Sequence, residues 1–192
     1  MQKLSKGLML PIAILPIAGL FLGIGAGIEN ILIQAGSTSN GAYVFANVLK
    51  QTGDIVFANL PILFAVAVAI AFTDDAGVAG LSAVLAWAVM NGTQQIFIND
   101  ISVAEGFDKG TIYSILFYSR VPGSVVTQNI GITSMQTSVF GGIIVGLTVA
   151  GLYNKFKTTQ LPAILGFFSG TRFVLIVTFL TSILLGFGFL ML

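Results

Sequence analysis

The apolar positions of this chain gather into five strongly hydrophobic runs, separated by polar turns and two longer connections. The runs cover residues 7–28, 55–72, 77–90, 139–153 and 173–192. A helix that crosses the hydrocarbon core of a bilayer needs about 20 predominantly apolar residues. The pattern therefore predicts an all-α transmembrane bundle with about five spans. Because run 77–90 is short, a re-entrant segment is an alternative there.

The polar parts of the pattern predict the connections and the orientation. Residues 29–54 and 91–138 form the long connections, and we expect apolar patches of the second to lie along the membrane surface. Cytoplasmic loops carry an excess of Lys and Arg. A cytoplasmic N-terminus places most basic residues inside, namely Lys3, Lys6, Lys155, Lys157 and Arg172, and leaves Lys50, Lys109 and Arg120 outside. The bias favours this orientation.

Composition supports a membrane protein and excludes several chemistries. Hydrophobic residues make up 56% of the chain and charged residues only 8%, against about 25% charged in ordinary soluble domains. Cysteine and histidine are both absent, which excludes disulfides, thiolate metal sites and a histidine proton shuttle. A net charge of +1 indicates no basic face for nucleic acid. We expect no catalytic residue, metal or cofactor in this chain.

Glycines recur every fourth residue in two of the runs. Gly19, Gly23 and Gly27 share one face of the first predicted helix, and Gly142 and Gly146 share a face of the fourth. This spacing lets another helix backbone approach closely. It predicts helix packing, either within one bundle or at an oligomer or domain interface, and the residues alone leave both open.

Two polar segments carry candidate chemistry. Asp74 and Asp75 lie in the turn before run 77–90; a helix cap is the favoured interpretation, and cation binding or proton relay is the alternative. In residues 153–172, basic residues at both ends bracket an apolar middle with Pro162 and Gly166. This pattern is typical of a cytoplasmic loop with an interfacial or re-entrant segment. It would anchor at anionic headgroups, line a path or receive a cytoplasmic partner.

Several ordered motifs together resemble a known membrane domain. They occupy residues 7–11, 15–19, 57–66, 77–79, 140–146, 153–156, 161–162, 165–168 and 172–174. In this order they resemble the membrane-embedded IIC domain (EIIC) of the glucose/maltose/N-acetylglucosamine-type phosphotransferase system. The resemblance covers nearly the whole chain.

The resemblance implies a sugar permease of the bacterial plasma membrane that phosphorylates its substrate during uptake. A phosphorylated IIB domain would supply the phosphate from a cysteine. Residues 1–192 resemble the N-terminal half of IIC, which mainly builds the dimer and scaffold. The family's pocket half carries a histidine and a Gly-Ile-Thr-Glu motif; here Gly131-Ile132-Thr133 is followed by Ser134, at another place in the chain. We therefore expect a homodimer or a complementary IIC half as partner.

Other departures concern the turn before run 77–90 and the loop that would face IIB. Ala76 stands where the family usually has Asp, Ala163 and Ile164 replace Glu-Tyr, and Thr171 and Leu175 replace a Lys and a Pro.

The resulting hypothesis is a sugar path formed jointly with another IIC segment. Its path or gate candidates are Asn59, Pro61, Gly170 and Arg172. A non-catalytic membrane scaffold or inert truncated product, and an ion-coupled carrier or channel, remain alternatives.

Overall fold

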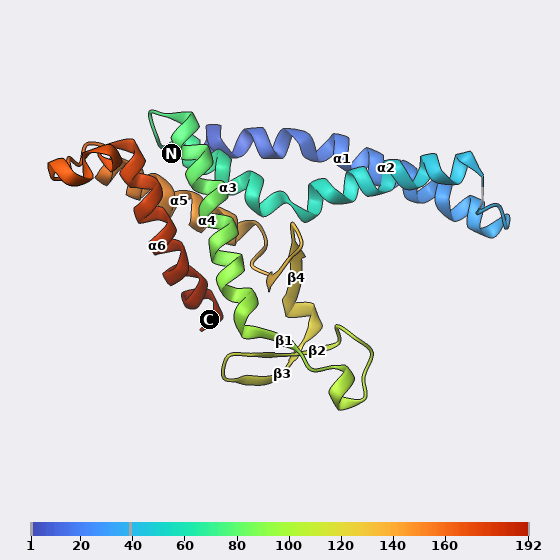
Figure 1. Ribbon diagram of the computed structural model, residues 1–192. Helices are drawn as coiled ribbons and strands as arrows, with labels where there is room; N and C mark the ends of the chain where they lie inside the picture. The colour runs from blue at the N-terminus through green and yellow to red at the C-terminus, as the bar shows by residue number, and fades with distance from the viewer. Residues whose placement is uncertain (1, 39, 192) are drawn as a thin grey trace.

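Helices form most of the chain, and two small β-sheets interrupt them (Figure 1). The structure is a computed structural model that describes residues 2–38 and 40–191. Leu192, the end of the last predicted run, lies outside the described residues. The long helices are α1 (Gln2–Gln34), α2 (Gly41–Ala58), α3 (Leu60–Ala71), α4 (Ala76–Phe97), α5 (Ser138–Phe156) and α6 (Thr171–Leu190).

Within the described residues, four helices are long and apolar enough to cross a membrane. They are α1 over Gly7–Gln34, α4, α5 and α6. Helices α2 and α3 pass the same test only together, across a bend of 50° at Asn59. The prediction of an all-α bundle with about five spans is confirmed. Run 55–72 is not one straight helix, however, because it contains the end of α2 and all of α3.

Three predicted helix limits are wrong because polar residues continue the helices. Helix α1 reaches Gln34 and α2 begins at Gly41, so the connection predicted over residues 29–54 shrinks to a short turn. Asn40 caps α2, its side chain accepting a hydrogen bond from the Tyr43 amide at 2.9 Å. Helix α4 continues to Phe97, so it has 22 residues and is long enough to cross a membrane. Its second half stays helical because Asn91 and Gln94 are buried inside the protein rather than in contact with lipid.

The connection over residues 91–138 folds into strands, which the sequence did not predict, and it leaves Phe117 and Tyr118 of its apolar patch 83% and 60% exposed. Strands β1 (Ile98–Asp100), β2 (Ile112–Ile115) and β3 (Tyr118–Pro122) form an antiparallel sheet in that order. Strands β4 (Val126–Asn129) and β5 (Ile132–Met135) form a separate hairpin. Ile98 and Ile115 face each other across β1 and β2 and pack with Leu190 of α6. These apolar side chains are therefore covered by protein.

The remaining short elements are 3₁₀ turns. They are η1 (Val103–Glu105), η2 (Gly123–Val125) and η3 (Ala163–Phe168). The last lies in the segment that the sequence marks as interfacial or re-entrant, between α5 and α6. Its side chains are exposed, Ile164 at 96% and Phe167 at 70%.

Small residues form the core where α3, α4 and α5 meet. Its buried members are Ala65, Ala69, Ala79, Ala83, Ala86, Trp87, Met90, Val145 and Val149. Alanine allows helix backbones to approach, which suits helix packing in a membrane, where lipid tails are as apolar as side chains. Helix α6 packs along α4, and a Cβ on Gly186 would lie 2.8 Å from Thr93 Cβ.

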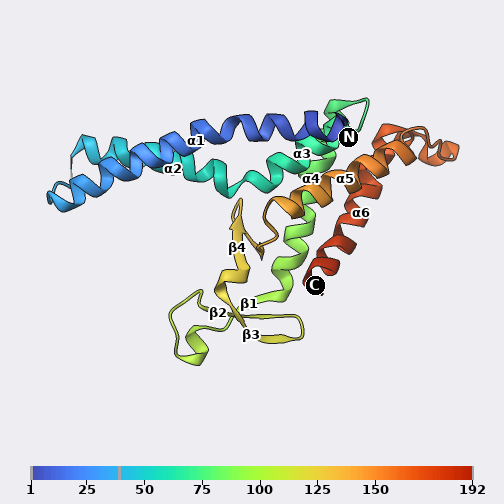
Figure 2. The ribbon, with the colours of Figure 1, turned by 180° about the vertical axis from the view of Figure 1, so that it is seen from behind.

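Helices α1 and α2 lie side by side and extend away from the other helices in both views (Figures 1 and 2). In this arm, Lys50 Nζ lies 2.6 Å from Glu29 Oε2, and Glu29 is only 8% exposed. At the opposite end of the arm, a Cβ on Gly7 would lie 2.6 Å from Ala71 Cβ. The start of α1 thus lies at the α3–α4 turn, whereas the strands lie at the other end of α4.

Candidate functional site

The break between α2 and α3 follows from one asparagine and one proline. Asn59 ends α2 and precedes α3 with φ −101° and ψ 11°. Pro61 lies in the first turn of α3, where a missing N–H is tolerated, whereas in a continuous helix it would remove a backbone hydrogen bond. Asn59 Nδ2 donates to the Ile55 carbonyl at 2.7 Å. Its Oδ1 is buried and accepts no hydrogen bond within the described part of the chain.

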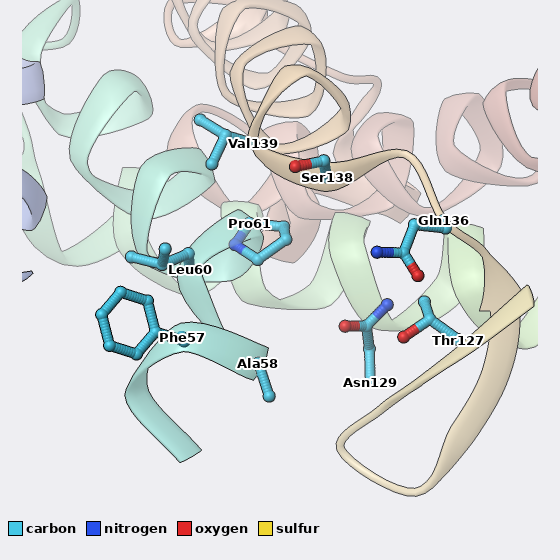
Figure 3. A pocket seen from close by; sticks show the side chains of 9 residues that line it. All are labelled: Phe57, Ala58, Leu60, Pro61, Thr127, Asn129, Gln136, Ser138 and Val139. Carbon is cyan, nitrogen blue, oxygen red and sulfur yellow. The ribbon is translucent and has the colours of Figure 1, made fainter. Parts of the chain in front are cut away.

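A recess of about 120 Å³ opens beside this break (Figure 3). Its lining comes from the end of α2, the start of α3, the β4–β5 hairpin and the start of α5: Phe57, Ala58, Leu60, Pro61, Thr127, Asn129, Gln136, Ser138 and Val139. Pro61 is therefore part of the wall, whereas Asn59 lies beside the recess and not in its lining.

The hairpin presents its polar side chains through strand alternation. Thr127 and Asn129 lie two residues apart on β4, so both face the recess while Gln128 faces away. Asn129 pairs with Ile132 across the turn. The Met135 amide donates to Gln94 Oε1 at 3.0 Å, which fixes the hairpin to α4.

Helix α5 starts at the recess and lies close against α3. A Cβ on Gly142 would overlap the carbonyl oxygen of Pro61, and one on Gly146 would lie 2.6 Å from the Ala65 carbonyl oxygen. The absence of side chains at these two positions lets the α5 backbone come within van der Waals distance of α3. It also sets how near Ser138 lies to Pro61, and so the width of the recess.

The glycines of α1 take a different arrangement from that of α5. A Cβ on Gly19 would be 3.9 Å from the Phe57 ring, and one on Gly23 or Gly27 would meet nothing within 4 Å. The close approach of α1 to α2 instead uses Gly25 and Gly53, and a Cβ on Gly25 would lie 2.7 Å from the Ala46 carbonyl oxygen. Gly25 is two residues from both Gly23 and Gly27, about 200° around the helix, so the spacing of four residues pointed to the opposite face. Only the partner helix shows which glycines are covered.

Gly170 and Arg172 close the loop that contains η3. Gly170 has φ 70°, a conformation that favours glycine, and its amide donates to the Thr159 carbonyl at 2.9 Å. Arg172 Nη1 donates to the Phe167 carbonyl at 3.0 Å, and the guanidinium lies 4.6 Å from the Phe167 ring centroid.

The four path or gate candidates do not form one site. Pro61 lies by the start of α5, whereas Gly170 and Arg172 follow its end. A helix of 19 residues is about 28 Å long at about 1.5 Å per residue. The bilayer-crossing length of α5 therefore separates the recess from the η3 loop.

The aspartates of the α3–α4 turn have separate roles. Asp75 caps α4, its Oδ1 accepting from the Gly77 and Val78 amides at 3.0 and 3.1 Å, which confirms the favoured interpretation for this residue. Asp74 pairs with Lys157 just beyond α5, and this hydrogen bond raises the pKa of the Lys157 amine above its ordinary value. The pair joins the turn to the end of α5.

The chemistry of the recess suits binding rather than proton transfer. Hydroxyls, carboxamides and one aromatic ring line it, and its lining contains no acid or base. Among the described residues, no group of three or more Asp and Glu side chains could hold a metal ion. The sequence pointed to Pro61 but missed Thr127, Asn129, Gln136 and Ser138. These polar residues of a mixed connection carry no motif, and only the hairpin brings them to the helix break.

Apolar helices of spanning length, one of them broken beside a polar recess, define a multi-pass membrane protein. Comparison with known proteins specifies the class. Residues 5–192 match the profile of the family described as "Phosphotransferase system, EIIC". Because the match covers nearly the whole chain, the chain belongs to the phosphotransferase system EIIC family, whose members reside in bacterial membranes. The suspected resemblance is confirmed.

Curated relatives are named as glucose-specific components. The chain is 51% identical over 175 residues to the "PTS system glucose-specific EIICBA component" of Mycoplasma genitalium, covering 91% of this chain and 18% of that protein. The protein of the same name from Mycoplasma pneumoniae is 47% identical over 186 residues, 94% of this chain and 19% of the relative. The protein of the same name from Staphylococcus saprophyticus is 38% identical over 190 residues, which cover 97% of this chain and 26% of that relative. The chain thus spans 18–26% of the length of these relatives and corresponds to EIIC sequence.

Proposed function

We propose that this chain forms part of the translocation path for a glucose-type sugar in a phosphoenolpyruvate-dependent phosphotransferase system. The observation that carries the proposal is the neutral polar recess beside a broken membrane helix. Discontinuous helices recur at substrate sites of transporters because they bring polar groups into the bilayer. Membership of the EIIC family and the glucose-specific relatives support the choice of substrate class.

The proposal requires a phosphorylated IIB domain as partner. The chain has no cysteine or histidine, so the phosphate must be carried by another segment or protein. The relatives are named EIICBA, which supports a B component as that carrier. The η3 loop, with Gly170 and Arg172, is the proposed region of contact with IIB. It joins the end of α5 to the start of α6, and it has exposed apolar side chains with basic residues beside them.

Residues 1–192 would serve as the scaffold half of the IIC unit, next to a second copy or a complementary IIC segment. The protruding α1–α2 arm supports this proposal. Gly23 and Gly27 lie on α1 with space around them, so another helix could approach there without displacing side chains.

We also propose a cytoplasmic N-terminus. The start of α1, the α3–α4 turn and the end of α5 lie together, and Lys155, Lys157 and Arg172 are near that end. The positive-inside tendency would place this end in the cytoplasm. Cysteine at Thr38, in the α1–α2 turn, should then react with an impermeant maleimide in intact cells, and cysteine at Thr158 only after permeabilisation. The reverse labelling pattern would contradict the orientation.

Reconstituted vesicles test the function. The chain would be combined with the remaining IIC segment of a glucose-specific relative, and external phospho-IIB would be supplied on the loop side. Sugar phosphate should form only when all three components are present, with omission of phospho-IIB as the control. Sugar phosphate from the chain and phospho-IIB alone would contradict the division into halves.

The same vesicles distinguish the two alternatives. Uptake driven by an ion gradient without sugar phosphate would favour an ion-coupled carrier, in which Asp74 should be essential. If no combination transports or phosphorylates sugar although the components assemble, the scaffold role alone would stand.

A further inference from the structure

We propose that the recess between the α2–α3 break and the β4–β5 hairpin binds one uncharged hexose ring directly. This inference rests on the proposed function, because it assigns a place on this chain to the same class of substrate. The recess is lined by the β4–β5 hairpin and by the start of α5, which is the end of that helix opposite the η3 loop. With a cytoplasmic N-terminus, it would meet sugar arriving from outside.

Two carboxamides provide hydrogen-bonding groups of both kinds. Asn129 is 7% exposed, and its Nδ2 donates to Ser134 Oγ at 3.1 Å. Figure 3 shows its oxygen directed toward the helix break, with the Gln136 side chain beside it. The Gln136 amide donates to the Val125 carbonyl at 2.8 Å, which holds the backbone of that residue in place. Sugar hydroxyls both donate and accept, so an array of amide oxygens and nitrogens matches them.

The opposite wall is apolar. Ala58 and Pro61 lie on the helix side of the recess, whereas the Phe57 ring points away from the hairpin in Figure 3, and its tip would be 3.9 Å from a Cβ on Gly19 of α1. Apolar atoms of this wall can contact the C–H groups on one side of a pyranose. A ring with hydroxyls at its edge and C–H groups on its face therefore fits this pairing of walls.

The charge of the lining selects a neutral ligand. None of the nine lining residues is Asp, Glu, Lys or Arg. The starts of α3 and α5 both lie here, without side-chain caps, and the first-turn amides of α5 point out of the helix end and can donate to ligand oxygens. Helix starts also attract anions, but a charged ligand leaving water would lack a counter-charge in this recess. Inorganic phosphate is therefore the competitor to test.

Backbone strain adds support for a binding role. Ser138 has φ 52°, as does Ile130 in the hairpin turn. Non-glycine residues rarely adopt positive φ, and such residues cluster at binding sites. Here one strained residue, Ser138, lines the recess, and the other, Ile130, lies in the turn that follows Asn129. The strained backbone therefore helps to direct polar groups toward the recess.

The size of the recess predicts weak binding of a single ring. Its volume of about 120 Å³ is below the range of about 300–1,000 Å³ of pockets that enclose drug-sized ligands. One face of a bound hexose would stay open, and a disaccharide would find contacts for only one of its rings.

The test measures binding without any phosphate donor. The full chain in nanodiscs would be titrated with glucose and observed by saturation-transfer NMR. Gln136→Ala should weaken binding roughly three- to tenfold, as expected for one lost hydrogen bond. Gln128→Ala is the matched control, because it removes the same group from the face of β4 that points away from the recess, and it should leave binding unchanged.

Each other outcome would overturn the inference. No saturable glucose signal, equal binding by the Gln136→Ala and Gln128→Ala variants, or displacement of glucose by inorganic phosphate would each do so. If phosphorylation-coupled uptake persists in the complete system while glucose binding here fails, only this inference is wrong. If glucose binds here but the complete system never phosphorylates sugar, the proposed function fails and the hexose site stands.

Discussion

Replacement of Gly146 by alanine tests the packing that sets the width of the recess. The added Cβ would lie 2.6 Å from the Ala65 carbonyl oxygen and 2.8 Å from Val68 Cβ, whereas ordinary contacts are 3.4–4 Å. The first of these atoms belongs to the α3 backbone and the second is bonded directly to it, so neither can move away without a shift of α3. Helix α5 must therefore shift from α3 and loosen the contacts of Val145 and Val149, which are almost fully buried.

The magnitude follows from two opposing terms. Overpacking a close-packed core costs about 1–3 kcal/mol, and replacing a helical glycine by alanine gains about 0.5–1 kcal/mol. We expect the Gly146→Ala variant to lose up to about 2.5 kcal/mol of unfolding free energy on balance. Gly151→Ala on the same helix is the matched control, because a Cβ there meets nothing within 4 Å. It should be unchanged or up to about 1 kcal/mol more stable.

Reversible unfolding in mixed micelles with increasing SDS would measure both variants. The single tryptophan of the chain, Trp87, belongs to the same α3–α4–α5 core and is 2% exposed, so its fluorescence reports this packing. If Gly146→Ala proves at least as stable as Gly151→Ala, the close approach of α5 and α3 is not as described.

Two further predictions concern other parts of the molecule. Gly25→Ala should weaken α1–α2 crosslinking within one chain, because its Cβ would overlap the backbone nitrogen of Lys50, whereas Gly23→Ala should not; equal crosslinking of both variants would contradict the arm packing. Hydrogen bonds from Ser102, chiefly from its hydroxyl, lower the pKa of the Asp100 carboxyl. The ionised carboxylate therefore stabilises its loop at neutral pH. This stabilisation is lost as the pH falls below the ordinary pKa of 3.8. Asp100→Asn should therefore speed amide exchange at Gly110 at neutral pH, and exchange at the wild-type rate would contradict it.

The spans could be predicted from sequence because the bilayer sets their length and each run satisfies it locally. The break at Asn59 was not predicted as a bend, although Asn59 and Pro61 were noticed. An insertion free energy sums over the whole run and is insensitive to where a helix changes direction. The helical continuation through Asn91 and Gln94 was missed for a similar reason: polar side chains look like a loop until α4 is seen to bury them.

The strands and the Glu29–Lys50 ion pair likewise depend on tertiary contacts that local sequence does not show. Strands of three to five residues carry little periodic signal, and no local pattern shows that Ile98 and Ile115 pack against Leu190 of α6. The Glu29–Lys50 pair joins residues of two helices, and no local pattern connects them.

By itself the sequence determined the solvent, the number of spans, the family and the absence of cysteine and histidine, since these depend on composition, run length and ordered motifs. The tertiary structure alone decided which glycines lie against a neighbour, where a span breaks, and that Thr127, Asn129, Gln136 and Ser138 meet Pro61. The physical reason is that a recess requires surfaces from segments distant along the chain. Their distance in space depends on how closely α3, α4 and α5 pack.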